Sequence, residues 1–382
     1  MPSWLKSALT AVLGVTLGAS VFAAILGGGV LVTMTNGYAL AATASLPITS
    51  FTPSTKSGVT TVAIALGTSG TVVSDALGPF GIFAQSDKFQ VYTVAQKRYP
   101  VVLSGGLSTI PDYSLADVTE QIAPRPDIIV VPAIVDPTSG TEKPLRDWIA
   151  SAARHGAMIL GVCAGANVLG AAGVLDGKIA TTHWADIDSF ASTYRSTEWV
   201  SGQRFIQDGN ITTTAGVTSG IAGALRLVEQ IAGTAEADRI GMRVAYPGWG
   251  IGVSTTISKK TLDFSDYPYA LNAALPWLQP SYAIGVTPGV DEIDLAAAFE
   301  VYSGSSFATH TTAVAQNAIT TTAHGLTLLT TPTSTLKSGV DRLIILGHPS
   351  DATTASLFGR ANELHIASYL PNLTAPAGES AY

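Results

Sequence analysis

Short apolar runs alternate with stretches of helical periodicity through the middle of the chain. Thr61–Leu66, Phe89–Ala95 and Asp127–Pro132 are mainly apolar and contain β-branched residues, as expected of buried strands in a parallel sheet. Glu142–Ala153 instead carries apolar residues at the spacing of an amphipathic helix. This alternation of strand and helix predicts an α/β domain with a doubly wound, flavodoxin-like parallel sheet.

The stretch Gly156–Gly177 combines a predicted strand (Ala157–Leu160), a sharp turn and a helix of small residues. The turn reads Gly-Val-Cys-Ala-Gly, which is the sulfur counterpart of the Gly-x-Ser-x-Gly nucleophile elbow. Its glycines tolerate a strained turn, and the N–H groups that open the helix would lower a thiol pKa and stabilise an oxyanion. Cys163, the sole cysteine, is therefore the strongest candidate nucleophile, although a lone cysteine is more commonly a small core residue.

Three further elements are predicted after the elbow. Lys178–Trp184 is expected to be a strand that brings His183 near the sheet. Arg204–Gln207 and Ile211–Thr214 flank an Asp-Gly-Asn turn and predict a hairpin. The amphipathic stretch from Thr218 to residue 232 predicts a helix with Thr218 as its cap.

The last third of the chain resembles a repeat of the first α/β unit. Asp294–Phe299 aligns with Asp75–Phe80, and Asp341–Leu346 aligns with Asp127–Pro132. The offset changes only from 219 residues (294 − 75) to 214 (341 − 127), which argues against chance. We therefore predict an N-terminal segment over 1–40, linkers over 41–58 and 247–280, an α/β domain over 59–246, and a partial repeat over 281–382 that lacks the cysteine elbow.

Residues 7 to 55 contain no charged side chain, and Ser7–Thr35 is an apolar run long enough to cross a membrane. Lys6 precedes the run, which by the positive-inside rule keeps the N-terminus cytoplasmic. The run is longer than the core of an ordinary signal peptide, which favours an uncleaved single-pass transmembrane helix; the alternative is a signal peptide cleaved near Ala39–Ala41. In both cases the folded part is expected outside the cytoplasm.

Composition and spacing exclude several classes of function. Only 12% of the residues are charged, the net charge is −7, and no cluster of Lys and Arg exists, which excludes an electrostatic nucleic-acid surface. One cysteine excludes an internal disulfide. The histidines lack metal-ligand spacing and the glycines match no phosphate-binding fingerprint, so we expect no metal and no cofactor.

Four stretches together resemble the ThiJ/PfpI superfamily, whose fold is of the class I glutamine-amidotransferase type; they are Ser74–Phe80, Gly161–Gly177, Ala180–Trp184 and Thr214–Leu227. Within it the chain is most similar to isocyanide-hydratase-like members and to the amidase-like domains of some AraC-type regulators. The resemblance implies a nucleophilic Cys163 and a carboxyl partner, Asp75, which hydrogen-bonds the sulfur and moves a proton. Taken alone, Asp75 is more commonly a helix N-cap, and His183 is a candidate base or a structural residue.

The chain departs from the family pattern at three positions. Ala164 follows the cysteine where many members carry His or Thr, Ala133 replaces a glycine of the turn that helps form the oxyanion site, and Ala222 replaces an aspartate. These changes argue against peptidase activity. Ala164, Gly165 and Ala133 remain the expected elbow and oxyanion residues.

Two functions stay open. The first is a membrane-anchored enzyme in which Cys163, Asp75 and His183 hydrate or hydrolyse a small carbon–nitrogen or carbonyl compound. The alternative is a non-catalytic module of the same fold that binds a small ligand or senses oxidants through Cys163. Dimers are common in the resembled family, so a homodimer and a repeat that replaces the partner subunit both remain open.

Overall fold

The computed structural model describes residues 26–39, 56, 58–244, 254–261, 264–304, 306–336, 339–347 and 351–369. Most of the predicted membrane segment, the cleavage site near residue 40 and most of the first linker lie outside these ranges, whereas most of the second linker (247–280) lies within them. Residues 26–37 form a helix, called here the N-proximal helix. Among the helices in the described ranges, none has both the length and the apolar character needed to cross a bilayer.

A seven-stranded sheet organises the first unit, and its only antiparallel pair among the described strands is β10–β11. Its strands lie in the order β10 (Phe205–Asp208), β11 (Ile211–Thr214), β7 (Met158–Gly161), β6 (Ile128–Val131), β1 (Thr60–Ala65), β2 (Phe89–Ala95) and β5 (Tyr113–Ser114). The predicted α/β fold with a doubly wound, mainly parallel sheet is confirmed.

Helices cover both faces of this sheet because alternate residues of each strand point to opposite sides. In β1, Val62 and Ile64 pack toward one face, which is covered by α2 (Val73–Ala84), α7 (Val217–Ala232) and α8 (Thr234–Arg243). Ala63 and Ala65 face the other side, covered by α3 (Leu115–Thr119), α4 (Lys143–Arg154) and α5 (Gly165–Ala171). The apolar runs of these strands are continuous because both faces of the sheet are buried.

The second unit repeats the strand order of the first. Its five parallel strands lie in the order β16 (Thr331–Pro332), β13 (His310–Ala315), β12 (Ser281–Val286), β17 (Arg342–Leu346) and β18 (Ala367–Tyr369), which matches β5-β2-β1-β6-β7. Two helices, α10 (Glu292–Phe299) and α11 (Ala352–Glu363), take the places of α2 and α4. The structural repeat thus extends past Leu346, where the sequence matches end, to the counterpart of the strand that precedes Cys163.

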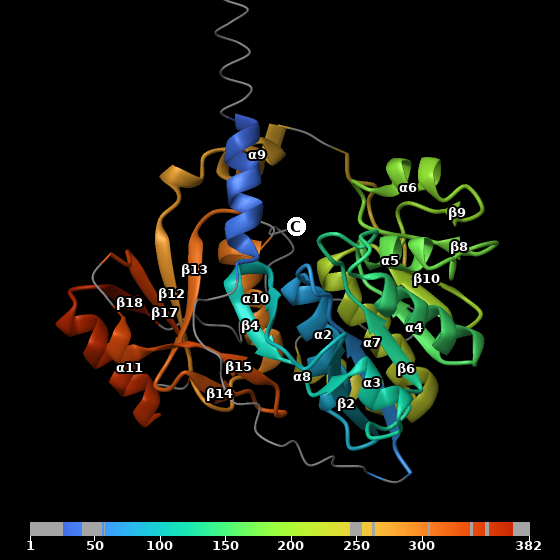
Figure 1. The fold of residues 1–382 in the computed structure, drawn as a ribbon, viewed down its shortest axis with the longest axis horizontal. Coiled ribbons are helices and arrows are strands. Elements are labelled where there is room, and N and C mark those ends of the chain that lie inside the picture. Colours follow the sequence, from blue (N-terminus) through green and yellow to red (C-terminus); the bar gives the residue numbers. More distant parts are fainter. Residues whose placement is uncertain are drawn as a thin grey trace, which may run out of the picture.

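The two units share one apolar core. They also share one small sheet, whose strands β4, β14 and β15 are labelled in Figure 1. Helix α10 packs on α2, with Ile293 against Gly81. A four-stranded sheet combines β3 (Val101–Leu103) and β4 (Leu107–Ile110) with β14 (Ile319–Thr321) and β15 (Thr327–Leu329), and β4 pairs antiparallel with β15. Equivalent elements of the two units therefore face each other, as in a pseudo-symmetric pair.

Two local predictions are wrong. The strand expected over Lys178–Trp184 is only β8 (Ile179–Ala180), which pairs with β9 (Glu198–Trp199) in a separate small sheet. Strand β11 already occupies the edge of β7, and the residues after β8 instead bond to side chain and backbone groups of β11 and the elbow: the Thr181 N–H donates to Thr213 Oγ1, and Thr182 Oγ1 donates to the Cys163 carbonyl. Helix α7 begins after Gly216 with no side-chain cap, so Thr218 is not the cap.

The remaining described helices and helical turns are short. They are α6 (Ile187–Thr193), α9 (Tyr267–Ala274), the 3-10 turns η1 (Ser104–Gly106), η2 (Phe264–Asp266), η3 (Pro276–Leu278) and η5 (Thr333–Thr335), and the π-helical turn η4 (Glu300–Gly304). Figure 1 shows α9 beside the N-proximal helix at one end of the molecule.

Candidate functional site

The elbow places Cys163 between β7 and α5 in a strained conformation. Its φ is 55°, in the left-handed region that non-glycine residues rarely adopt and that costs on the order of 1–3 kcal/mol. A Cβ at Gly165 would lie 2.0 Å from the Val131 carbonyl oxygen, so only glycine fits there. Thr182 Oγ1 donates to the Cys163 carbonyl (3.0 Å), and the Cys163 N–H donates to Thr214 Oγ1 (3.4 Å). Neighbouring elements thus hold the strained turn in place.

Asp75 lies in the first turn of α2 and is fully buried. The N-cap position is Val72, so the alternative of Asp75 as an N-cap is wrong; the Val73 N–H instead donates to Ser104 Oγ (2.9 Å). The Ala133 N–H donates to Asp75 Oδ2 (3.2 Å), whereas Oδ1 has no hydrogen-bond partner among the described residues. Ala133 is therefore not the free oxyanion donor that was predicted.

Burial holds the pKa of Asp75 well above its usual range, and the charge of Glu300 adds to this effect. Hydrogen bonds from the Ala133 N–H and the Cys163 thiol act in the opposite direction but do not outweigh burial. The site consequently favours a protonated Asp75 carboxyl beside the sulfur, which is the state a proton donor needs.

The Cys163 thiol is nearly buried, with 8% of the residue exposed. Burial, followed by the charge of Asp75, raises the pKa of the thiol well above its usual value, while the Ala164 N–H lowers it. The expectation that the elbow N–H groups would leave a low thiol pKa is therefore wrong for the resting site, because desolvation and carboxylates outweigh them. The thiol and the carboxyl are buried close to each other and compete for protons.

His183 lies near Cys163 although its predicted strand is reduced to β8, which ends before it. A Cβ at Gly216 would lie 3.4 Å from His183 Cδ2 and 3.9 Å from the Cys163 sulfur, so both side chains lie against Gly216. His183 Nδ1 is 3.7 Å from Asp186 Oδ2, yet burial lowers the pKa of His183 more than Asp186 raises it. A neutral imidazole next to the thiol is a suitable proton acceptor.

Two residues near the site had no counterpart in the sequence interpretation. Glu300, on η4 of the second unit, is 2% exposed, and its charge raises the pKa of Asp75, Cys163 and Tyr38. The Tyr38 ring packs against Gly70, where a Cβ would lie 2.4 Å from Tyr38 Cδ1, and its side chain hydrogen-bonds Ser104. An acidic residue within the apolar stretch Ala296–Val301 was the available signal for Glu300.

A cavity of about 330 Å³ lies beside Tyr38, between the N-proximal helix, η1, η4 and β13. Its walls include Ser104, Ser303, His310 and Thr311. In the part of the chain that the structure describes, no group of three or more His, Cys, Asp or Glu side chains is arranged to hold a metal ion. The described side chains of the site offer a thiol (Cys163), two carboxyl groups (Asp75 and Glu300) and an imidazole (His183).

The DJ-1/PfpI family matches residues 60–230. Isonitrile hydratase from Pseudomonas putida is 36% identical to the chain over 174 residues, which is 45% of this chain and 72% of that protein. The chain belongs to the DJ-1/PfpI family. This confirms the resemblance read from the sequence.

A second relative of this DJ-1/PfpI protein is the HTH-type transcriptional regulator CdhR from Pseudomonas aeruginosa, 31% identical over 148 residues, or 39% of this chain and 42% of the regulator. Among solved structures, a ThiJ/PfpI family protein from Pseudomonas syringae is similar, with 24% identity, a TM-score of 0.44, and coverage of 55% of this chain and 84% of that one. The family thus includes relatives named as enzymes and as regulators.

Proposed function

We propose that the protein is a cysteine-dependent hydratase acting on a small carbon–nitrogen electrophile of the isonitrile class. The observation that carries this proposal is the Cys163 thiol at a strained elbow beside the fully buried Asp75 carboxyl. The similarity to isonitrile hydratase over 72% of that enzyme supports the substrate class. Peptidase activity is not part of the proposal, because Ala164 and Ala133 remove features that the resemblance associates with it.

The proposed reaction begins with addition of the thiol to the terminal isonitrile carbon. A C–S bond forms, and the thiol proton reaches the same carbon through Asp75, giving a thioimidate, R–N=CH–S–Cys163. Water then adds across the C=N bond, with its hydroxyl on carbon and its proton on nitrogen. Collapse breaks the C–S bond and returns a proton to sulfur through Asp75 or His183. The net change is R–NC plus water to R–NH–CHO.

The test is turnover of a small alkyl isonitrile by the full chain, with the N-alkyl formamide measured by liquid chromatography. Formation of formamide that Cys163→Ala abolishes would support the proposal. Absence of turnover with an isonitrile, combined with hydrolysis of a small amide, would replace it by amidohydrolase chemistry. A chain that turns over neither compound would contradict the enzymatic proposal.

A ligand-binding module is the second candidate, favoured by the nearly buried thiol with its raised pKa and by similarity to the regulator CdhR. Redox sensing fits less well, because oxidation proceeds through the thiolate and burial disfavours that form. Saturable binding of a small molecule that blocks alkylation of Cys163, without turnover, would identify this function.

We also propose that the chain is anchored in a membrane by its N-terminal apolar run, with the folded part outside the cytoplasm. The uncharged sequence from residue 7 to residue 55, preceded by Lys6, supports this orientation. Alkaline extraction of membranes tests it, because a membrane-spanning anchor stays in the pellet whereas a cleaved or peripheral chain is released.

A further inference from the structure

We propose that one end of the folded part lies in the headgroup region of a lipid bilayer, through an aromatic and aliphatic surface that surrounds the N-proximal helix. We call it the apical face; it consists of Val30, Leu31, Val32, Met34, Phe264, Tyr267, Tyr269, Leu271, Trp277 and Leu278. This inference rests on the membrane anchor proposed above, and adds a second contact with the bilayer that is remote in sequence.

In the N-proximal helix, the distribution of side chains between the inner and outer faces is the reverse of that in an amphipathic helix in water. Its small residues point inward: a Cβ at Gly29 would lie 1.8 Å from the Ala274 carbonyl oxygen, and Thr33 Oγ1 donates to the Ala273 carbonyl (2.7 Å). Its larger side chains point outward, and Leu31 is 68% exposed. A water-facing helix would bury the large apolar side chains and expose the small polar ones.

The elements packed beside this helix expose aromatic residues in the same way. Phe264 is 87% exposed, Trp277 59% and Leu278 70%. The rings of Phe264 and Tyr267 stack on each other at 5.4 Å rather than packing into the core. Exposed apolar surface of this extent marks a binding site, and Trp and Tyr are the residues enriched where a protein meets the membrane interface.

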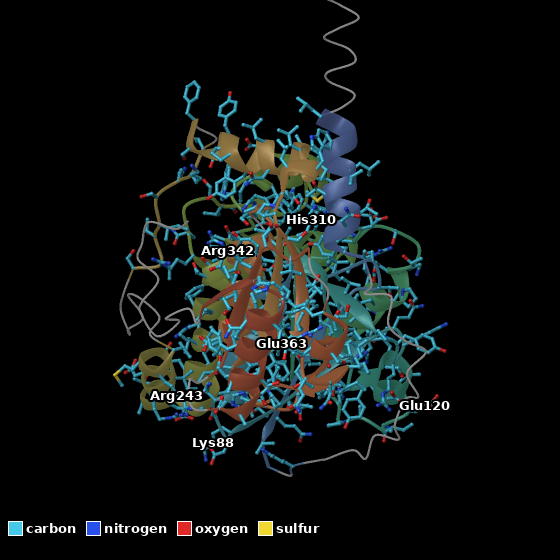
Figure 2. The ribbon with its side chains drawn as sticks, turned by 90° about the vertical axis from the view of Figure 1, so that its left-hand side faces the viewer. Lys88, Glu120, Arg243, His310, Arg342 and Glu363 are labelled. Atoms are coloured by element: carbon cyan, nitrogen blue, oxygen red, sulfur yellow. The ribbon has the colours of Figure 1, made fainter. Side chains whose placement is uncertain are left out.

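Charge is nearly absent from this end. Residues 26–39 and 264–280 contain a single charged side chain, Asp266, which pairs with Lys260 at 3.1 Å. Figure 2 shows α9 and the N-proximal helix at one end, and Lys88, Arg243 and Glu120 toward the opposite end. The uncharged sequence continues from the helix back to residue 7 without interruption, a further 19 residues (7 to 25), close to the ~20 that span a bilayer. That continuity favours lipid over a second protein copy.

The test is the environment of a spin label on the apical face of the full chain reconstituted in phosphatidylcholine vesicles. Leu278→Cys in a Cys163→Ser background carries the label, and Glu120→Cys in the same background is the control at the far end. We expect the ratio of oxygen to nickel-chelate collision rates to rise several-fold at Leu278 on reconstitution, and not at Glu120. Phe264→Cys provides a second labelled position, and circular dichroism verifies folding.

Three other results would overturn the inference, and they can be distinguished from one another. A label at Leu278 that stays accessible to the nickel chelate in vesicle-bound chain would leave the anchor standing but remove the apical face from the bilayer. Failure of the full chain to bind vesicles would overturn both. Dipolar broadening between labels of two copies would assign the face to self-association. None of these results bears on isonitrile turnover, which is measured separately.

Discussion

The two units share a strand order, yet the helix that follows the first strand has a different role in each. In the first unit, Asp75 of α2 is fully buried, and burial holds its pKa well above the usual range. At the aligned position of the second unit, Asp294 of α10 is only half-buried, and burial together with Asp291 raises its pKa to about 6. At this aligned position the carboxyl is therefore fully buried only in the unit that carries the cysteine elbow.

A second difference is that the contribution across the interface is one-sided. The charge of Glu300, in the second unit, raises the pKa of Cys163. The aligned position in the first unit (300 − 219 = 81) is Gly81, and its lack of a side chain leaves space for Ile293. The partial repeat thus contributes a charge to a site that it does not possess itself. In this duplicated fold, one copy carries the cysteine site and the other places a buried carboxyl near it.

The largest expected effect separates the two aligned aspartates. Asp75→Asn should lower kcat/KM for the isonitrile by about 10²- to 10⁴-fold, since it removes the proton carrier beside the sulfur. Asp294→Asn should leave kcat/KM close to that of the wild type. Equal losses in both variants would show that α2 and α10 do not differ in function.

Two glycines give the next comparison, measured as free energies of unfolding in urea. Gly165→Ala should destabilise the protein by ~3 kcal/mol, because its Cβ would overlap the Val131 carbonyl oxygen. Gly359→Ala, on the exposed side of α11 with no atom near its Cβ position, should stabilise it by ~1 kcal/mol. A free energy of unfolding that is unchanged in Gly165→Ala would contradict the close approach of the elbow to the Val131 carbonyl oxygen.

Glu300→Gln tests the one-sided contribution across the interface. Removing this charge removes a cause that raises the pKa of both Cys163 and Asp75, so alkylation of Cys163 by iodoacetamide should begin at lower pH. Glu363→Gln, an exposed change on α11, is the control and should leave the alkylation profile unchanged. An unchanged profile in Glu300→Gln would remove the second unit from the site.

The smallest expected effect belongs to a pair found only in the second unit. His324 Nδ1 lies 2.7 Å from Oε2 of the buried Glu292, and this hydrogen bond raises the pKa of His324. Its contribution, ~1 kcal/mol, should be full below pH 6.5 and disappear as pH rises through the raised pKa. The pKa of Glu292 is lowered, because its hydrogen bonds outweigh burial, so acid must first reach that lower pKa to break the pair.

Urea unfolding of the wild type and of His324→Gln at pH 6 and pH 9 measures this effect. The wild type should lose stability between the two pH values by more than the variant does. The same loss in both proteins would assign the pH dependence to other groups.

Local patterns were sufficient for the parts of the fold that depend on local chemistry. The strands β1, β2, β6 and β7 followed from apolar runs, and the elbow followed from its glycines. The strand predicted over Lys178–Trp184 failed because β11 occupies the sheet edge it would need, which is a matter of tertiary competition.

The site was predicted only in part for the same reason. Cys163, Asp75 and His183 do lie close together, but Tyr38 and Glu300 come from segments far away in the sequence, and only Glu300 had a local signal. The direction of the thiol pKa was also missed, because the burial of Cys163 in the folded protein cannot be read from the elbow sequence itself. Desolvation is a property of the assembled fold.

The most direct test of the central claim, that Cys163 and Asp75 share one buried proton-exchanging pocket, is the pH dependence of Cys163 alkylation in the full chain and in Asp75→Asn. The wild-type thiol should titrate above the usual value of about 8.5, and Asp75→Asn should move that titration to lower pH. A wild-type thiol that titrates at its usual value, and does so equally in Asp75→Asn, would contradict the pairing on which the proposed chemistry depends.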